Sequence, residues 1–196
     1  APVDHVDELI ITPGTQGALF LALGAVVDQG TKVAIVEPDY FANRKLVRFF
    51  GGEMMPIPLH YHGTEAQNGP DLDALEAACD GGAKVLVFST PNNPTGHVFS
   101  ETAITKIAAL AAKHDVTVIV DQLYSRLLYS NESYTHLRAC AIRPEKLVTI
   151  MGPSKTESLS GFRLGVAFGS AQLIERMEKL QAIVSLRAAG YSQAAL

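Results

Sequence analysis

Short apolar segments alternate with segments of helical periodicity along the chain, and this alternation restricts the possible folds more than any other feature. A buried strand is a short run of β-branched and apolar residues ended by a turn residue, whereas a helix repeats apolar residues every three or four positions. The pattern favours an α/β fold with a mostly parallel sheet covered by helices on both faces. Strands are predicted at residues 8–12, 31–37, 53–59, 84–89, 116–120 and 146–150, and helices at residues 15–28, 41–50, 71–79, 100–114 and 171–184.

Composition excludes several classes of partner. With 47% hydrophobic and 18% charged residues, the chain is expected to be globular. The formal net charge of −4 argues against a surface that binds nucleic acid. No apolar run reaches the roughly 18 residues that a membrane-spanning helix requires, so no membrane partner is expected. Cys79 and Cys140 show no metal-binding spacing and suit a reducing compartment, which indicates a cytoplasmic protein.

Both ends of the sequence look cut. The chain begins with Ala1 and Pro2 rather than methionine, and residues 185–196 stop inside an unfinished alanine-rich pattern. Its 196 residues are enough to bury one large core, so one domain is expected. We therefore expect one domain taken from a longer protein.

Polar residues suited to chemistry follow five of the predicted strands. In parallel sheets, ligands bind outside the carboxyl ends of the strands. Each of these residues could have a purely structural role. Coincidence is, however, a poor explanation for five strand ends that all carry such residues at one edge of a sheet. In strand order, the residues are Thr15 with Gln16, Tyr40, Asn93, Asp121 with Tyr124, and Lys155.

The first predicted strand is followed by a turn that contains a glycine, and a predicted helix comes directly after it. Such a turn offers free backbone N–H groups and the positive end of a helix dipole, so Gly14, Thr15 and Gln16 could hold a phosphate. The signal is weak, because the turn matches no established phosphate-loop motif. The structural alternative is an ordinary helix N-cap at Thr15.

Two further strand ends carry an amide and a carboxylate. Prolines and a glycine fix residues 90–96 tightly, so this loop could aim the Asn93 amide as a hydrogen-bond donor; the alternative is a turn that needs Asn and Gly for its backbone only. Asp121 ends the most apolar strand, where an acid is costly unless paired, so it needs a cation. The alternative for Asp121 is a cap for the turn that follows.

Lys155 and Arg163 lie between two apolar runs. Lys155 sits among small polar residues just past a buried strand, which holds an amine in a fixed place, and a guanidinium eight positions later can grip an anion. The alternative is a pair of ordinary surface charges. His60 and His62 could bind a metal, but no third ligand is in view, so a solvated loop is favoured and no metal is predicted.

Three motifs together resemble the class I/II aminotransferases, pyridoxal-phosphate enzymes of fold type I. The motifs are Pro-Asn-Asn-Pro-Thr-Gly at residues 91–96, Asp-Gln-Leu-Tyr at residues 121–124, and Ser154-Lys155 with Arg163. The resemblance implies that residues 1–196 form the large cofactor-binding domain, without an N-terminal segment and a C-terminal small domain. It also implies a three-layer α/β/α fold of the aspartate-aminotransferase type, with a seven-stranded mixed sheet whose last strand, residues 164–168, is antiparallel.

The resemblance assigns catalytic roles to Lys155, Asp121 and Tyr124. Lys155 forms the Schiff base with pyridoxal 5′-phosphate and then moves a proton, while Asp121 pairs with the pyridine nitrogen. Asn93 and Tyr124 hydrogen-bond the phenolic oxygen of the ring, and Tyr40 stacks on its face. The phosphate is held by Gly14, Thr15, Gln16, Ser154 and Arg163. One departure is Gly152, where many relatives carry a serine that binds phosphate.

The implied activity is transfer of an amino group between an amino acid and a 2-oxo acid. The family usually forms homodimers, and its arginine for the substrate carboxylate lies outside this chain, so the substrate is not predicted. Two alternatives remain. One is a lyase that uses the same scaffold for β-elimination or carbon–sulfur cleavage, and the other is a non-catalytic cofactor-binding domain of a regulator.

Overall fold

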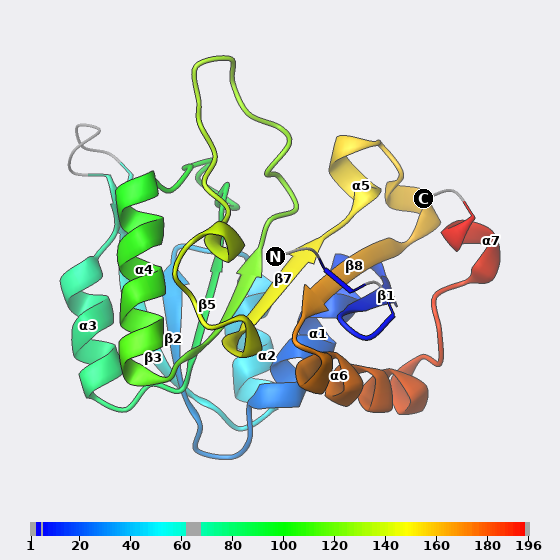
Figure 1. Ribbon diagram of the computed structural model, residues 1–196, viewed down its shortest axis with the longest axis horizontal. Coiled ribbons are helices and arrows are strands. Elements are labelled where there is room, and N and C mark those ends of the chain that lie inside the picture. Colours follow the sequence, from blue (N-terminus) through cyan, green and yellow to red (C-terminus); the bar gives the residue numbers. More distant parts are fainter. Residues whose placement is uncertain (1–2, 5, 62–67, 195–196) are drawn as a thin grey trace.

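A computed structural model describes residues 3–4, 6–61 and 68–194. Its centre is a mixed sheet between two layers of helices, with α3 and α4 on one face and α1, α2 and α6 on the other (Figure 1). The strands are β1 (Leu9–Pro13), β2 (Lys32–Glu37), β3 (Glu53–His60), β4 (Gly69–Pro70), β5 (Val85–Ser89), β6 (Thr117–Asp121), β7 (Leu147–Met151) and β8 (Leu164–Gly169). The α-helices are α1 (Gly14–Val26), α2 (Phe41–Phe49), α3 (Leu72–Asp80), α4 (Glu101–His114), α5 (Pro153–Thr156), α6 (Ala171–Val184) and α7 (Gly190–Gln193).

The strand order is β1-β8-β7-β6-β5-β2-β3-β4. β8 is antiparallel to both of its neighbours, as expected, and β5, β6 and β7 are parallel to one another. The expected number of seven strands was wrong, because β4 adds an eighth along the last two residues of β3. A strand of two residues has no periodicity from which it could be recognised, and it lies in a stretch interpreted as a loop.

The sheet is buried on both faces, which explains why its central strands read as continuous apolar runs. Side chains alternate along each strand, so Val85 and Val87 of β5 pack in the cluster with α1 and α6, whereas Leu86 and Phe88 pack in the cluster with α3 and α4. Two hydrophobic cores on opposite faces hold the sheet rigid. Among the described residues, no helix combines the length and apolar character that crossing a bilayer demands.

Side-chain caps fix the start of three helices. Asp71, Ser100 and Ser170 each accept a hydrogen bond from a backbone N–H in the first turn of α3, α4 and α6. Helix α1 differs, because it begins at Gly14 directly after Pro13 and has no side-chain cap. The alternative of an N-cap at Thr15 was therefore wrong, and the first N–H groups of α1 have no capping side chain.

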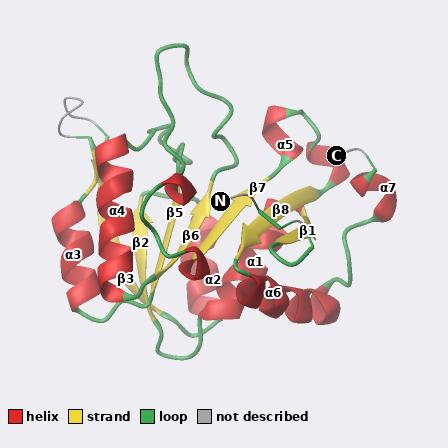
Figure 2. Cartoon of the chain, in the orientation of Figure 1, coloured by secondary structure: helices red, strands yellow, loops and turns green. Residues whose placement is uncertain are grey.

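The carboxyl ends of β1, β2, β5, β6 and β7 lie along one edge of the sheet. β1 leads directly into α1, whereas a turn or loop follows each of the other four strands, and Figure 2 shows loops above the sheet where β7 leads into α5. β8 runs the other way, so its first residue lies at this edge. Residues that follow five strands and the residue that precedes β8 are thereby brought together.

Candidate active site

One cavity of about 210 Å³ lies at the carboxyl edge of the sheet. Nine of the ten residues predicted from the sequence line it, contributed by turns that are far apart along the chain. They are Thr15, Gln16, Tyr40, Asn93, Asp121, Tyr124, Ser154, Lys155 and Arg163. Two larger hollows, of about 480 Å³ and about 810 Å³, adjoin it but are lined by neither Lys155, Asp121 nor Arg163.

Gly14, the tenth predicted residue, lies behind the cavity wall and makes room for Arg163. Its φ is +76°, in the region that favours glycine, and a Cβ there would lie 2.7 Å from Nη2 of Arg163. Arg163 also donates from Nη1 to the Ser160 carbonyl oxygen at 2.7 Å. The guanidinium is thus held against the uncapped start of α1, and the two positive groups form a place for an anion.

The reversed direction of β8 is what brings Arg163 here. Arg163 directly precedes Leu164, the first residue of β8. Because β8 is antiparallel to β7, its start lies beside the end of β7, from which Ser154 and Lys155 follow. A parallel β8 would have placed Arg163 at the opposite edge of the sheet.

Gly152 and Thr15 share one small space. A Cβ at Gly152 would lie 2.8 Å from Cγ2 of Thr15 and 3.1 Å from the Leu164 carbonyl oxygen. A serine at position 152 would therefore need Thr15 to move. The threonine side chain occupies the space that a side chain at position 152 would need.

Asp121 is an acid in need of a positive partner. Burial raises the pKa of its carboxyl group from 3.8 to about 6, and the backbone N–H of Leu123, 2.9 Å from Oδ1, lowers it in part. Within the described ranges the carboxylate takes part in no salt bridge. The contact with Leu123 shows that the structural alternative, a cap for the next turn, also applies. Its other oxygen remains available to a cationic or N–H donor in the cavity.

The adjacent residues Asn92 and Asn93 have different tasks. Asn92 is buried, and its Oδ1 accepts hydrogen bonds from the Thr95 backbone N–H at 3.2 Å and from the Thr95 hydroxyl at 2.7 Å. Asn92 therefore holds the turn. In the part of the chain that the structure describes, the Asn93 side chain makes no hydrogen bond, and it lines the cavity. Its amide can therefore meet a ligand.

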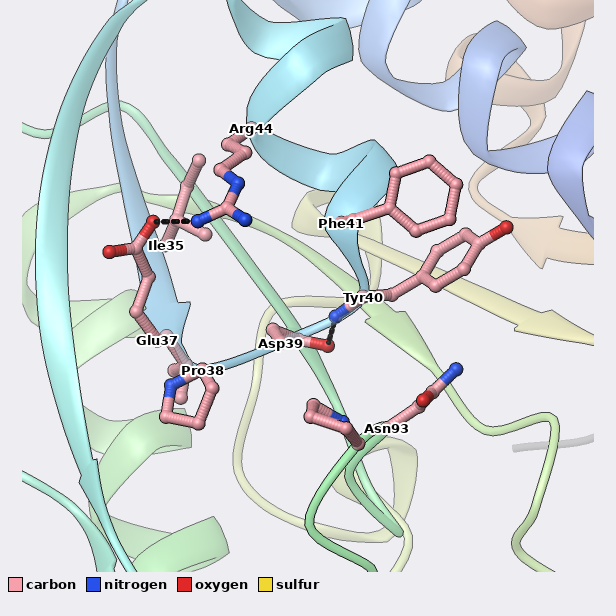
Figure 3. Close-up of a pocket in the computed structure, with 10 residues that line it drawn as sticks. Ile35, Glu37, Pro38, Asp39, Tyr40, Phe41, Arg44 and Asn93 are labelled. Carbon is pink, nitrogen blue, oxygen red and sulfur yellow. Dashed lines mark hydrogen bonds and ion pairs between the residues drawn. The ribbon is translucent and has the colours of Figure 1, made fainter.

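Two tyrosines form further parts of the wall. Tyr40 follows β2, and Figure 3 shows its ring extending from the turn above Asn93. Tyr124 comes three residues after Asp121, and burial together with the Asp121 charge raises the pKa of its hydroxyl. Tyr124 is therefore a hydrogen-bond donor at neutral pH rather than a phenolate.

Lys155 lies in α5, a single helical turn after β7. Ser154 before it is buried, while Lys155 is exposed and lines the cavity. Lys155 and Arg163 place positive charge in the lining, and Asp121 places negative charge in it. The cavity can therefore hold a molecule with an anionic group and a separate N–H or cationic group.

Four lining residues were missed from the sequence, namely Leu19, Ser89, Leu123 and Ser160. Ser89 is the last residue of β5, so its place at a strand end could have indicated it. Ser160 belongs to the small polar stretch around Lys155. Leu19 and Leu123 carry no chemical signal, because an apolar residue that lines a ligand site looks like a core residue.

The predicted absence of a metal concerned His60 and His62. His62 lies outside the described residues, and His60 is 3.7 Å from an Asp71 carboxylate oxygen. Among the residues that the structure describes, no three His, Cys, Asp or Glu side chains form a metal-binding group.

Comparisons with known proteins point to one family. The chain matches the family model described as aminotransferase class I and II over residues 1–196. A solved aspartate aminotransferase from Rhodobacter sphaeroides 2.4.1 is 68% identical with a TM-score of 0.97, covering 99% of this chain and 50% of that one. The N-succinyldiaminopimelate aminotransferase from Mycobacterium tuberculosis has a TM-score of 0.92 at 28% identity, covering 100% of this chain and 50% of that one.

A relative found by sequence similarity belongs to the same family. The aspartate/prephenate aminotransferase of Thermus thermophilus is 32% identical over 173 residues, which are 87% of this chain and 43% of that protein. The chain thus spans about half the length of the relatives it matches.

Proposed function

The chain belongs to the class I and II aminotransferase family, and from this premise we propose that it forms the large cofactor domain of an enzyme that moves an amino group between an amino acid and a 2-oxo acid. One observation carries the proposal. A lysine, a partly buried acid that forms no salt bridge with any described residue, and an arginine at an uncapped helix start line the same cavity. These are the groups that a phosphorylated pyridine aldehyde requires.

Class I and II aminotransferases depend on pyridoxal 5′-phosphate. When bound, the cofactor supplies an aldehyde and an electron-withdrawing ring that stabilises negative charge on the substrate carbon. The described residues fit it at both ends. The costly Asp121 carboxylate matches a pyridine N–H, and the place for an anion beside Gly14 matches a phosphate.

Lys155 and Asp121 have the central roles in this proposal. The Lys155 amine would hold the cofactor aldehyde and, once released by substrate, would accept the proton from Cα of the amino acid. An amine can do both because it is a nucleophile and a base. Asp121 would keep a proton on the pyridine nitrogen, since a nearby ionised carboxylate favours the protonated ring.

The remaining lining groups orient the ring. Asn93 and Tyr124 would donate hydrogen bonds to its phenolic oxygen, and Tyr40 would stack on one face. Thr15 and Gln16 present backbone N–H groups to the phosphate. Arg163, the Gly14 turn and the Ser154 hydroxyl complete this end of the site.

We further propose that the enzyme is a cytoplasmic homodimer. Phe162 and Tyr191 are 44% and 85% exposed and border a hollow of about 540 Å³ beside Arg163. Apolar side chains so close to the site are suited to contact with a partner subunit. Light scattering on the full-length protein measures its mass directly.

The test is the visible absorption of the full-length protein with pyridoxal phosphate, in the wild type and in Lys155→Ala. We expect a bound-cofactor band that Lys155→Ala loses, because the alanine cannot attach the cofactor. Lys179→Ala is the matched control, since Lys179 is exposed on α6 and pairs with Glu175 at 2.7 Å, away from the cavity. Aspartate is the first donor to add, because of the 68% identity with the Rhodobacter enzyme.

The products distinguish the possible functions. Release of a 2-oxo acid together with amination of the cofactor supports transamination. Ammonia with pyruvate, formed from an amino acid that carries a leaving group on Cβ, indicates a lyase, and a band that no tested amino acid alters points to a lyase with another substrate or to a regulator. A wild-type protein without any lysine-dependent band contradicts the whole assignment.

A further inference from the structure

Asp39 lies in the turn between β2 and α2, one residue before Tyr40. Its carboxylate accepts three hydrogen bonds, from the Tyr40 backbone N–H at 2.6 Å, from the Ser89 backbone N–H at 2.8 Å and from the Ser89 hydroxyl. Figure 3 shows the bond to Tyr40 and the position of Asp39 between the Tyr40 turn and Asn93. The carboxylate therefore joins the turn after β2 to the end of β5.

Ser89 carries the connection onward. It is the last residue of β5, is 3% exposed, and its Oγ accepts a hydrogen bond from the Asn93 backbone N–H at 3.1 Å. A continuous path thus runs from the Tyr40 N–H through the Asp39 carboxylate and the Ser89 hydroxyl to the Asn93 N–H. Both ends of this path are residues whose side chains line the cavity.

These contacts begin where the sheet ends. β2 and β5 are neighbouring parallel strands whose last paired residues are Ile35 and Val87, and each strand ends two residues later. Beyond that point the segments that follow β2 and β5 form separate turns. Asn92 supplies a second tie between them, since its Nδ2 donates to the Pro38 carbonyl oxygen at 3.1 Å.

We propose that Asp39 is a positioning residue, which acts through Ser89 to fix the distance and angle between the Tyr40 ring and the Asn93 amide. The inference rests on the proposed function, in which one of these groups stacks on the cofactor ring and the other hydrogen-bonds its phenolic oxygen. Contacts from Tyr40 and from Asn93 together would fix the orientation of the cofactor ring. A shift of one turn relative to the other would therefore change that orientation. Asp39 itself does not line the cavity that contains Lys155.

A carboxylate is the side chain that this place requires. All three partners are donors, and an ionised carboxylate accepts about four hydrogen bonds, whereas an asparagine has one oxygen and adds two donors of its own. Burial, with a smaller contribution from the Asp121 charge, raises the pKa of Asp39 to about 7, and the three hydrogen bonds oppose this shift. The neighbouring charges on the hollow beside Asp39 are Glu37 and Arg44, which lie 4.0 Å apart.

The test compares three variants of the full-length protein, Asp39→Ala, Ser89→Ala and the control Glu37→Gln. Glu37 is a carboxylate two residues before Asp39 on the same hollow, and its partner is Arg44 rather than the Ser89 path. Two quantities are measured with pyridoxal phosphate, namely its dissociation constant and the visible circular dichroism per bound cofactor. The dichroism reports the orientation of the ring, which a general loss of stability does not alter.

We expect Asp39→Ala and Ser89→Ala each to raise the dissociation constant about tenfold, equal to about 1.4 kcal/mol. Both should also change the dichroism per bound cofactor, while Glu37→Gln stays within about twofold of the wild type, because a surface substitution costs little. The double variant should be no worse than the more damaging single one, since both substitutions break one path. The melting temperature of each cofactor-free variant is the control for folding.

The proposal is overturned if Asp39→Ala keeps the wild-type dissociation constant and dichroism, even with a lower melting temperature. That result would make Asp39 a structural residue only. Failure of the proposed function looks different, because the wild type itself would then show no cofactor band that depends on Lys155.

Discussion

Gly165 is the position where one added methyl group should damage the cofactor site most directly. It lies in β8 opposite Thr12 of β1. A Cβ at Gly165 would lie 2.4 Å from the Gly14 carbonyl carbon, and 2.5 Å from both the Gly14 oxygen and the Thr15 nitrogen. All three contacts are with backbone atoms, which cannot turn aside as a flexible side chain can.

The expected size of the effect follows from two opposing contributions. The backbone of Gly165 does not have a positive φ, so an alanine can adopt it and the penalty is one of space. Overpacking costs about 1–3 kcal/mol, and the smaller entropy of the unfolded alanine chain returns about 0.4–1 kcal/mol. The difference between these ranges is at most about 2.6 kcal/mol, and Gly165→Ala should lower the free energy of unfolding by about 1–2 kcal/mol, in the middle of that interval. That corresponds to a melting temperature about 2–8 °C lower.

The same substitution should weaken cofactor binding, because the backbone that must move carries the N–H groups assigned to the phosphate. We expect the dissociation constant for pyridoxal phosphate to rise about tenfold. Scanning calorimetry of the cofactor-free full-length protein and a cofactor titration measure the two effects. The control is Gly161→Ala, because a Cβ at Gly161 would meet no atom within 4 Å. If Gly165→Ala melts and binds like Gly161→Ala, the contact distances have been misinterpreted.

Two further predictions concern the opposite ends of the cofactor. Asp121→Asn should lower kcat/KM about 10–100-fold, because a charge-assisted hydrogen bond contributes about 1.5–3 kcal/mol. The folded-state pKa of Asp121 is raised, to about 6 from 3.8, so its contribution to stability is present below about pH 4 and is lost as the pH rises through about 6. Between pH 4 and pH 7, the melting temperature of cofactor-free Asp121→Asn should therefore fall less than that of the cofactor-free wild type. An identical pH dependence of the melting temperature in the two proteins refutes the raised pKa of Asp121. Arg163→Ala should raise the dissociation constant for pyridoxal phosphate more than that for pyridoxal, which has no phosphate, and equal losses for the two ligands argue against a phosphate contact.

Local pattern was sufficient to predict most of the elements. Helix α6 begins and ends where the apolar spacing predicted, and α4 begins within one residue of its predicted start and ends at the predicted residue. The strands were located to within one or two residues, because β-branched runs ended by turn residues are a local signal. The exception, β4, consists of two residues defined only by their pairing with β3.

The candidate site was predicted from the sequence to the extent that its residues stand at strand ends. Tyr40, Asn93, Asp121 and Lys155 could be selected in this way because parallel strands end at one edge of a sheet. Their roles remain proposals. Asp39 escaped notice, since nothing in a Pro-Asp-Tyr turn shows that its carboxylate reaches a serine fifty residues away.

The sequence by itself determined which segments are strands and helices, and which polar residues follow the strands. It did so because hydrophobic periodicity and turn chemistry act over a few neighbouring residues. Only the tertiary structure decided the position of Arg163, the shared space of Gly152 with Thr15, and the link from Asp39 to Asn93. Each depends on which strands lie side by side and in which direction they run, and those contacts join residues that the chain order keeps far apart.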